Sequence, residues 1–322
     1  MTIRDGETNI KYLLIISIVA AVLGIGLSYY EKKMEKILEK PFTFVSQDNK
    51  VKTQDEYSIL DRVSFWTEIS IKYYKLGTAE FIIYPLIEED HTFQFGYFEA
   101  YNNGEKVFFS EPVYKIADLL SFKYKNDKYI ILSDYSGGAH CCFQEYIFRL
   151  DENNDLKLIK SPPTGNTTIS ENNLIFKNGK LYLTIRDDRF AYFHTAYAGS
   201  YFFNRYFLIN GEELVESNLD FKEEYIKEAG DCKKDLDIYL DEKTIEDFEA
   251  WFPKLLCKAV NYLVIGEEGN AWEKFGDYFS KLSVIAPPRF KEDNLTTIKQ
   301  EIIEKMKEPA GSGTSQLENL QE

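Results

Sequence analysis

The stretch KNDKYIIL at residues 125–132 recurs as KNGKLYLT at residues 177–184, and this repeat decides the expected fold. In both copies a polar turn precedes a run rich in aromatic and β-branched residues, the composition typical of strands. An irregular loop follows each copy, and then an aromatic strand, YIFRL at 146–150 and YFLI at 206–209. Each unit closes with a polar turn and a last short strand. We therefore expect two similar antiparallel β units.

Part of a third unit precedes these two. Residues 92–101, TFQFGYFEAY, alternate in polarity and run into Asn102-Asn103-Gly104, a strong hairpin signal. Units about 50 residues apart, built from short antiparallel strands, are typical of β-propeller blades, although two and a half of them cannot close a propeller. The pattern leaves two architectures open: propeller-blade-like repeats, or a plain antiparallel sheet with similar turns. Residues 42–90 fit a helix or short strands, and we expect strands.

The sequence changes character near Asp241. The capping signal Thr244-x-x-Asp247 precedes apolar residues that recur at helical spacing. Glycines and the Pro287-Pro288 pair then separate further amphipathic stretches. The expected helical segments are residues 245–263, a second beginning at 270–275, and 295–306. The chain therefore combines a mainly β body with a small α-helical C-terminal part.

Near the N-terminus, residues 12–30, YLLIISIVAAVLGIGLSYY, contain no charged side chain. A helix of this length would span roughly 28 Å, close to the hydrocarbon thickness of a bilayer. The sequence thus predicts a transmembrane helix that acts as a signal anchor. Small residues around Gly24 and Gly26 keep cleavage as a signal peptide open.

The expected division of the chain follows from these segments. It comprises a short cytoplasmic N-terminus at 1–11, the membrane helix at 12–30, a helical stalk at 31–41, a β-rich domain at 42–240, the helical part at 241–308 and a disordered tail at 309–322.

The signals that predict the orientation of the membrane helix disagree. More lysines follow it than precede it, which favours a cytoplasmic C-terminal side. However, long domains translocate largely regardless of flanking charge, and four cysteines, an even number, suit an oxidising compartment. We expect a single-pass protein of the inner membrane, with residues 41–322 on the periplasmic, extracytoplasmic side of the cell envelope.

The net charge of the chain limits the classes of partner that it can bind. It carries 53 acidic and 38 basic side chains, a formal net charge of -15. Such a surface repels phosphate backbones, so nucleic acid is excluded as a partner class.

The densest group of chemically active side chains is SGGAHCC at residues 136–142. Adjacent cysteines in a strand point to opposite faces, so both thiolates reach one metal ion with difficulty. His91 and His194 lack ligand spacing relative to His140. We therefore expect no metal and no cofactor.

Disulfide bonding is the alternative use of the four cysteines, which allow three connectivities. We favour Cys141–Cys142, a strained bridge that would stiffen the loop, together with Cys232–Cys257. The second bridge would tie the last β segment to the helical part and contribute about 3 kcal/mol in the loop-entropy model.

Together with Asp134-Tyr135 and the aromatic strand that follows, SGGAHCC resembles a stretch of bacterial exported proteins related to the FG-GAP or VCBS type of propeller repeat. The resemblance covers roughly residues 95–159. It implies an exported β-repeat module and brings no established activity. In such proteins an Asp-rich, calcium-binding-like turn precedes the strand. This chain has Lys125-Asn126-Asp127-Lys128 there, which puts calcium in doubt.

The second repeat has a loop equivalent to SGGAHCC, which contains Asp187, Asp188, Tyr192 and His194. These side chains are either an acid/base set or simply an exposed loop apex. The G-x-S-x-G elbow of serine hydrolases is absent around Ser136.

We expect a membrane-anchored, non-enzymatic binding or scaffold module, with an envelope protein or a saccharide as its partner. The alternative is an envelope enzyme or a redox or metal protein that uses His140, Cys141 and Cys142. The candidate binding residues are Ser136, Gly137, Gly138, Ala139 and His140 of the first loop, and Asp187, Asp188, Tyr192 and His194 of the second.

Overall fold

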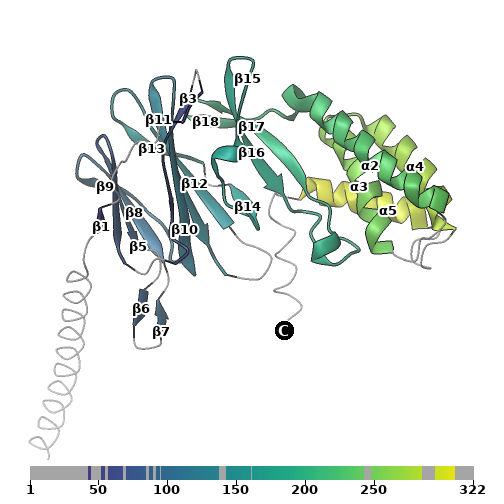
Figure 1. Cartoon of the computed structure of the whole chain (residues 1–322), viewed down its shortest axis with the longest axis horizontal. Coiled ribbons are helices and arrows are strands. Elements are labelled where there is room, and N and C mark those ends of the chain that lie inside the picture. The colour runs from purple at the N-terminus through teal and green to yellow at the C-terminus, as the bar shows by residue number, and fades with distance from the viewer. Residues whose placement is uncertain are drawn as a thin grey trace, which may run out of the picture.

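Three mainly antiparallel sheets stack face to face, and a bundle of helices follows them (Figure 1). The computed structural model describes residues 43–44, 52–54, 57–67, 70–84, 87–89, 92–94, 96–137, 143–160, 162–242, 248–284 and 294–308. The expectation of a mainly β fold with a small C-terminal helical part is confirmed.

The first sheet has the strand order β1-β4-β5-β8-β9, and only its β1–β4 pair is parallel. Its strands are β1 (Thr43–Phe44), β4 (Lys72–Leu76), β5 (Ala79–Tyr84), β8 (Tyr97–Asn102) and β9 (Glu105–Phe109), and a separate hairpin is formed by β6 (Ile87–Glu89) and β7 (Thr92–Gln94). Asn103 and Gly104, both at positive φ, make the predicted β8–β9 turn. The strands expected within residues 42–90 are confirmed.

The second sheet has the order β13-β12-β11-β10-β3-β2, and the short β14 pairs with β12. Its strands are β2 (Lys52–Gln54), β3 (Tyr57–Ser64), β10 (Lys115–Tyr124), β11 (Asp127–Tyr135), β12 (Phe143–Leu150), β13 (Leu156–Lys160) and β14 (Pro163–Gly165).

The third sheet is a four-stranded meander of β15 (Leu174–Lys177), β16 (Lys180–Asp187), β17 (Phe203–Asn210) and β18 (Glu213–Glu216). The repeat is confirmed, since β11-β12-β13 and β16-β17-β18 follow the same turn and strand pattern. The Asp127 turn is neutralised by Arg149, whose guanidinium donates to both carboxylate oxygens at 2.8 and 3.2 Å.

The second sheet lies between the other two and is buried on both faces. Ile130 and Leu132 of β11 pack with Phe81 and Phe98 of the first sheet. Tyr129 and Ile131, which alternate with them along the strand, pack toward the third sheet. In keeping with burial on both faces, β10 is buried without interruption from Ile116 to Phe122. The described sheets form an open stack and do not close into a ring.

Helices cover the outer face of the third sheet (Figure 1). They are α2 (Lys222–Glu242), α3 (Phe248–Val264), α4 (Glu268–Ser283) and α5 (Leu295–Lys307), preceded by the 3-10 turn η3 (Asn218–Phe221). Tyr182 and Tyr206 of the sheet pack against Phe221, Tyr225 and Ile265. This contact joins the helical part to the β stack.

The helical part begins at Lys222, earlier than the expected boundary at Asp241. The sequence KEEYIKEAGDCKKDLDIYLDE of α2 is so rich in charge that its apolar stripe is narrow. Only Tyr225, Ala229, Cys232 and Leu236 are buried, at spacings of four and three residues.

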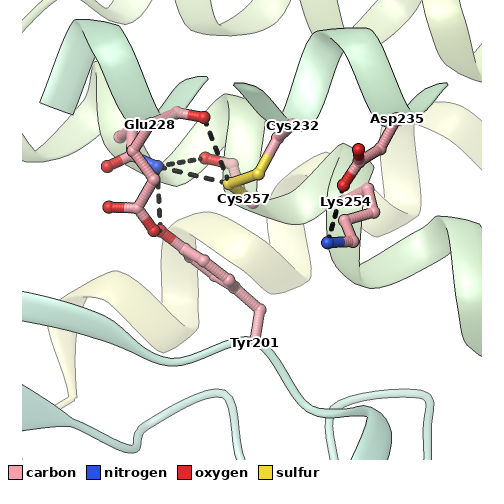
Figure 2. Close-up of a disulfide and its surroundings, with 7 residues drawn as sticks. Tyr201, Glu228, Cys232, Asp235, Lys254 and Cys257 are labelled. Carbon is pink, nitrogen blue, oxygen red and sulfur yellow. Dashed lines mark hydrogen bonds and ion pairs between the residues drawn. A yellow bond between two sulfur atoms is a disulfide. The ribbon is translucent and has the colours of Figure 1, made fainter. Parts of the chain in front are cut away.

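The predicted bridge between Cys232 and Cys257 is confirmed (Figure 2). Because Cys232 lies in α2, the bridge joins α2 to α3 and not, as expected, a β segment to a helix. An ion pair between Asp235 and Lys254 at 2.8 Å runs beside it. Cys141 and Cys142 lie outside the described residues.

The predicted membrane helix at 12–30, the stalk at 31–41 and the tail at 309–322 also lie outside the described residues. Within the part of the chain that the structure describes, no helix combines the length and the apolar character needed to cross a membrane.

Candidate functional site

An open cleft of about 280 Å³ lies where β11 ends and β12 begins, beside the first predicted loop. The β9–β10 connection and β14 complete its walls. Ser136 follows β11 directly and lines the cleft, and Gly137 comes next, whereas Gly138, Ala139 and His140 fall outside the described residues. The side chains that matter most for its chemistry are Glu111, Asp134, Phe143 and Tyr146.

Asp134 is the central polar group of the cleft. It lies two residues after Leu132, so strand alternation turns it to the same face, toward the first sheet. Only 2% of its surface is exposed. Burial raises the pKa of this carboxyl to about 6, although hydrogen bonds from the Tyr146 hydroxyl and the Gln144 backbone oppose the shift. Asp134 is therefore mostly ionised at neutral pH.

Four aromatic rings near the end of β11 contact one another and form what we call the edge cluster: Trp66, Tyr114, Tyr135 and Phe143. The ring of Tyr135 lies 4.9 Å from Phe143, 5.4 Å from Trp66 and 5.8 Å from Tyr114, measured between centroids. Trp66 is 42% and Tyr114 38% exposed, unusual for rings of this size in a packed sheet. Phe143 also lines the cleft, so the cluster and the cleft meet at this residue. Tyr135 and Phe143 are paired across β11 and β12, and strand alternation turns both side chains to the face opposite Asp134.

Gly137 lets the chain pass close to this cluster. Its φ of +100° is rarely adopted by L side chains, and a Cβ atom there would lie 3.6 Å from Cβ of Tyr114. The first glycine of the predicted loop therefore allows the backbone to pass beside Tyr114 in a conformation that other residues rarely adopt.

A buried carboxyl supports the cleft from the opposite face of the second sheet. Glu145 accepts hydrogen bonds from the Ser133 hydroxyl at 2.6 Å, and from the Thr164 hydroxyl and the Ile169 backbone at 3.2 Å each. Burial raises its pKa to about 8, and the nearby Asp134 adds to the shift. Glu145 thus holds residues 163–169, including the cleft wall β14, against β12.

The residues of the second predicted loop are not brought together as one acid/base set. Asp187 is paired with Arg189, whose Nη2 and Nε lie 2.7 and 2.9 Å from its two oxygens. His194 points to the helical part, where its Nε2 lies 2.7 Å from Oε2 of Glu301. Tyr192 packs against the ring of Tyr197, with 5.4 Å between centroids. The interpretation as a catalytic set is therefore not supported by their placement.

Asp188 alone among these residues approaches the cleft. It is fully buried, and neither carboxyl oxygen has a hydrogen-bond partner outside its own residue within the described structure. Burial and the charge of Asp187 raise its pKa. Its carboxyl lies against Gly165, a residue of the cleft wall, where it fills the space that a Cβ would take.

Sequence reasoning missed Glu111, Glu145 and the exposed rings of Trp66 and Tyr114. They come from connections and strands that are distant in sequence and meet only through sheet stacking. Among the described residues, no group of three or more His, Cys, Asp or Glu side chains is arranged to hold a metal ion.

Comparison of the chain with protein-family models, with curated proteins and with solved structures found no match.

Proposed function

We propose that this protein is a membrane-anchored, extracytoplasmic binding or scaffold module of the bacterial cell envelope, and that it acts without catalysis. The observation that carries the proposal is the exposed edge cluster, which meets the acidic cleft at Phe143. Concave, mostly apolar surfaces with a few fixed polar groups are typical of binding sites. Exposed rings beside such a cleft add apolar contact area for a partner.

The architecture supports a binding role because the site stands on rigid elements. β11 and β12 are central strands with both faces packed, and Glu145 fixes the cleft wall from behind. Sites on such elements keep their geometry without a bound partner. The proposed relation to propeller repeats of the FG-GAP or VCBS type rests on the sequence of residues 95–159.

The envelope location rests on residues 12–30 and on the Cys232–Cys257 bridge. The uncharged segment has spanning length, and disulfides persist mainly in oxidising compartments. We propose a single-pass anchor in the inner membrane, with an envelope protein or a saccharide as partner and no nucleic acid.

One observation favours a second candidate, an envelope enzyme or redox protein that uses His140, Cys141 and Cys142. Asp134, with a pKa of about 6, stands at the base of the loop that carries them and has the properties of a general acid or base. A thiol count and a metal analysis on the native protein separate the two. Free reactive thiols or stoichiometric metal would favour the second candidate.

The binding role predicts that capture of envelope material depends on the edge cluster. Immobilised full-length protein should retain a component of the wall or membrane fraction of its own cells. Replacing Trp66 and Tyr114 together with alanine should lower the retained amount at least tenfold, because both rings are exposed and support little of the core. Retention is measured by mass spectrometry and by sugar analysis of the eluate.

The matched control is Leu219→Ala, which removes an exposed apolar side chain from η3 at the helical end, 67% exposed and so more accessible than either ring. It should retain as much material as the wild type. Equal capture by all three proteins, or no capture by any, would refute the binding role at this edge.

A further inference from the structure

The chain enters the β stack through β1, at one end of the first sheet. β1 pairs in parallel with β4, and Thr43 is matched with Lys72. Because parallel strands run in the same direction, β1 begins at the end of the sheet at which β4 begins. Residues before Thr43 therefore join the stack from that end.

The edge cluster stands at the same end. Gly77, which follows β4, lies at the opposite end, where a Cβ atom on it would be 3.3 Å from Cδ2 of Leu150 and 3.5 Å from Nζ of Lys128. Leu150 is matched with Lys128 at that end of the β11–β12 pair. Tyr135 and Phe143 of the edge cluster are matched at the other end. β4 thus runs away from the edge cluster, and the chain enters β1 on the side of that cluster.

The chain length between them places the entry point near Trp66. Only six residues of chain lead from Trp66 to Lys72, and six extended residues span at most about 20 Å. Adjacent strands lie about 5 Å apart, which adds the step from Lys72 to Thr43. Thr43 therefore lies within about 25 Å of Trp66.

The proposed anchor is close to the same point. It ends at Tyr30, and 12 residues separate Tyr30 from Thr43. This length of chain spans about 20 Å as a helix and at most about 45 Å when extended. β11 in turn runs roughly 27 Å from Tyr135 back to Asp127. The turn at Asn126 therefore lies at the end of the stack that is remote from the anchor.

Phe109 marks the near end as well. It is the last residue of β9, and the β8–β9 turn lies at the remote end, beside Gly77. This position follows from the backbone of Asn103 in that turn, which donates to the carbonyl of Thr78. β9 therefore runs from the remote end toward the end that carries the edge cluster.

Exposed aromatic side chains are confined to the end near the anchor. Where the structure describes side-chain exposure, the exposed aromatic rings are those of Trp66, Tyr114 and Phe109, at 42%, 38% and 50%. Tyr114 directly precedes Lys115, which is matched with Tyr135 at this end of β11. Trp and Tyr are enriched where proteins meet the membrane–water interface. The position of the rings and the point of chain entry thus agree.

We infer, on the basis of the membrane anchor in the proposed function, that the end of the stack with the edge cluster faces the membrane. The turn at Asn126 then points away from the lipid. The partner of the edge cluster is therefore an envelope component present at the outer face of this membrane, where it meets the rings in the space between the stack and the lipid headgroups.

The test is energy transfer from the full-length protein to labelled lipids. The protein is reconstituted into phosphatidylcholine vesicles that contain a headgroup-labelled acceptor lipid, with a donor dye on Thr67→Cys or on Asn126→Cys. Both positions are exposed, Thr67 beside Trp66 and Asn126 at the remote end. Transfer from Thr67→Cys should be about three times as efficient or more, because transfer falls steeply with distance.

Two controls accompany this measurement. The unsubstituted chain, treated with the same dye, gives the background that is subtracted. Circular dichroism melts establish that both labelled variants are folded, and flotation of the vesicles establishes that the protein is inserted.

The outcomes separate the orientation from the proposed function. Insertion into the vesicles with equal transfer from the two positions, or with stronger transfer from Asn126→Cys, would overturn the orientation and leave the anchor and the binding function standing. Failure of the folded protein to float with the vesicles would remove the anchor, and the orientation with it.

Discussion

Replacing Gly165 with alanine should lower the free energy of unfolding by about 3 kcal/mol, a large change for one methyl group. A Cβ atom at this position would lie 2.1 Å from Oδ2 and 2.5 Å from Cγ of Asp188. The carboxyl cannot simply swing aside, because it is fully buried. The φ of +61° adds backbone strain for any residue with a side chain. Urea denaturation monitored by circular dichroism measures the change.

Gly211 provides a matched control, since it has the same φ of +61° and no atom near the position of a Cβ. Gly211→Ala should therefore lower the free energy of unfolding through backbone strain alone, by about 1 kcal/mol. Adding Asp188→Ala to Gly165→Ala should recover part of the loss, as expected for residues in direct contact. An equal loss of unfolding free energy at the two glycines would contradict the close contact between Gly165 and Asp188.

Replacing Glu145 with glutamine should change how stability depends on pH. Burial raises the pKa of Glu145 from the ordinary 4.5 to about 8. Between these values the folded chain holds a proton that the unfolded chain releases, so stability falls as pH rises. The stabilisation that the protonated Glu145 adds to the folded state is complete below pH 4.5 and lost above pH 8. Between these values the free energy of unfolding falls by up to about 1.4 kcal/mol per pH unit. Glutamine is neutral throughout and should remove this slope.

The measurement is the free energy of unfolding from pH 6 to 8.5 for both proteins. Asp134 contributes in the same direction, but with a pKa of about 6 it is half titrated near pH 6 and mostly ionised about one pH unit higher, so the upper part of the window isolates Glu145. Glu105→Gln, at an exposed position of β9, should run parallel to the wild type. Parallel curves for wild type and Glu145→Gln would contradict a buried, protonated Glu145.

The strands were predictable because their signals are local. The two turns before β11 and β16 carry the same residues, and Asn103-Gly104 adopts the positive φ values that a tight hairpin needs. The start of the helical part was not predictable, because α2 buries only four side chains and surrounds them with charge. Its contact with Tyr206 comes from tertiary packing, which no short window of sequence contains.

The candidate site was predictable only in its position along the chain. The loop after Tyr135 was singled out by its two glycines, its histidine and its two adjacent cysteines, and the structure places a cleft beside its first residue, Ser136. The side chains that give the cleft its character arrive from elsewhere: Trp66 follows β3, and Glu111 precedes β10. Conversely, Asp187 and His194 looked chemical in sequence but are paired with Arg189 and Glu301.

The most direct test of the central claim, that this edge binds a partner outside the cytoplasm, is labelling of a Thr67→Cys variant with a membrane-impermeant maleimide. Thr67 is exposed and adjoins Trp66 without belonging to the edge cluster. On intact spheroplasts, we predict labelling above the level of the unsubstituted chain, and at least fivefold slower labelling once the wall fraction of the same cells is added. A Leu219→Cys variant should be labelled equally fast with and without that fraction. Labelling of Thr67→Cys only after the membrane is broken, or at a rate that the wall fraction does not change, would contradict the claim.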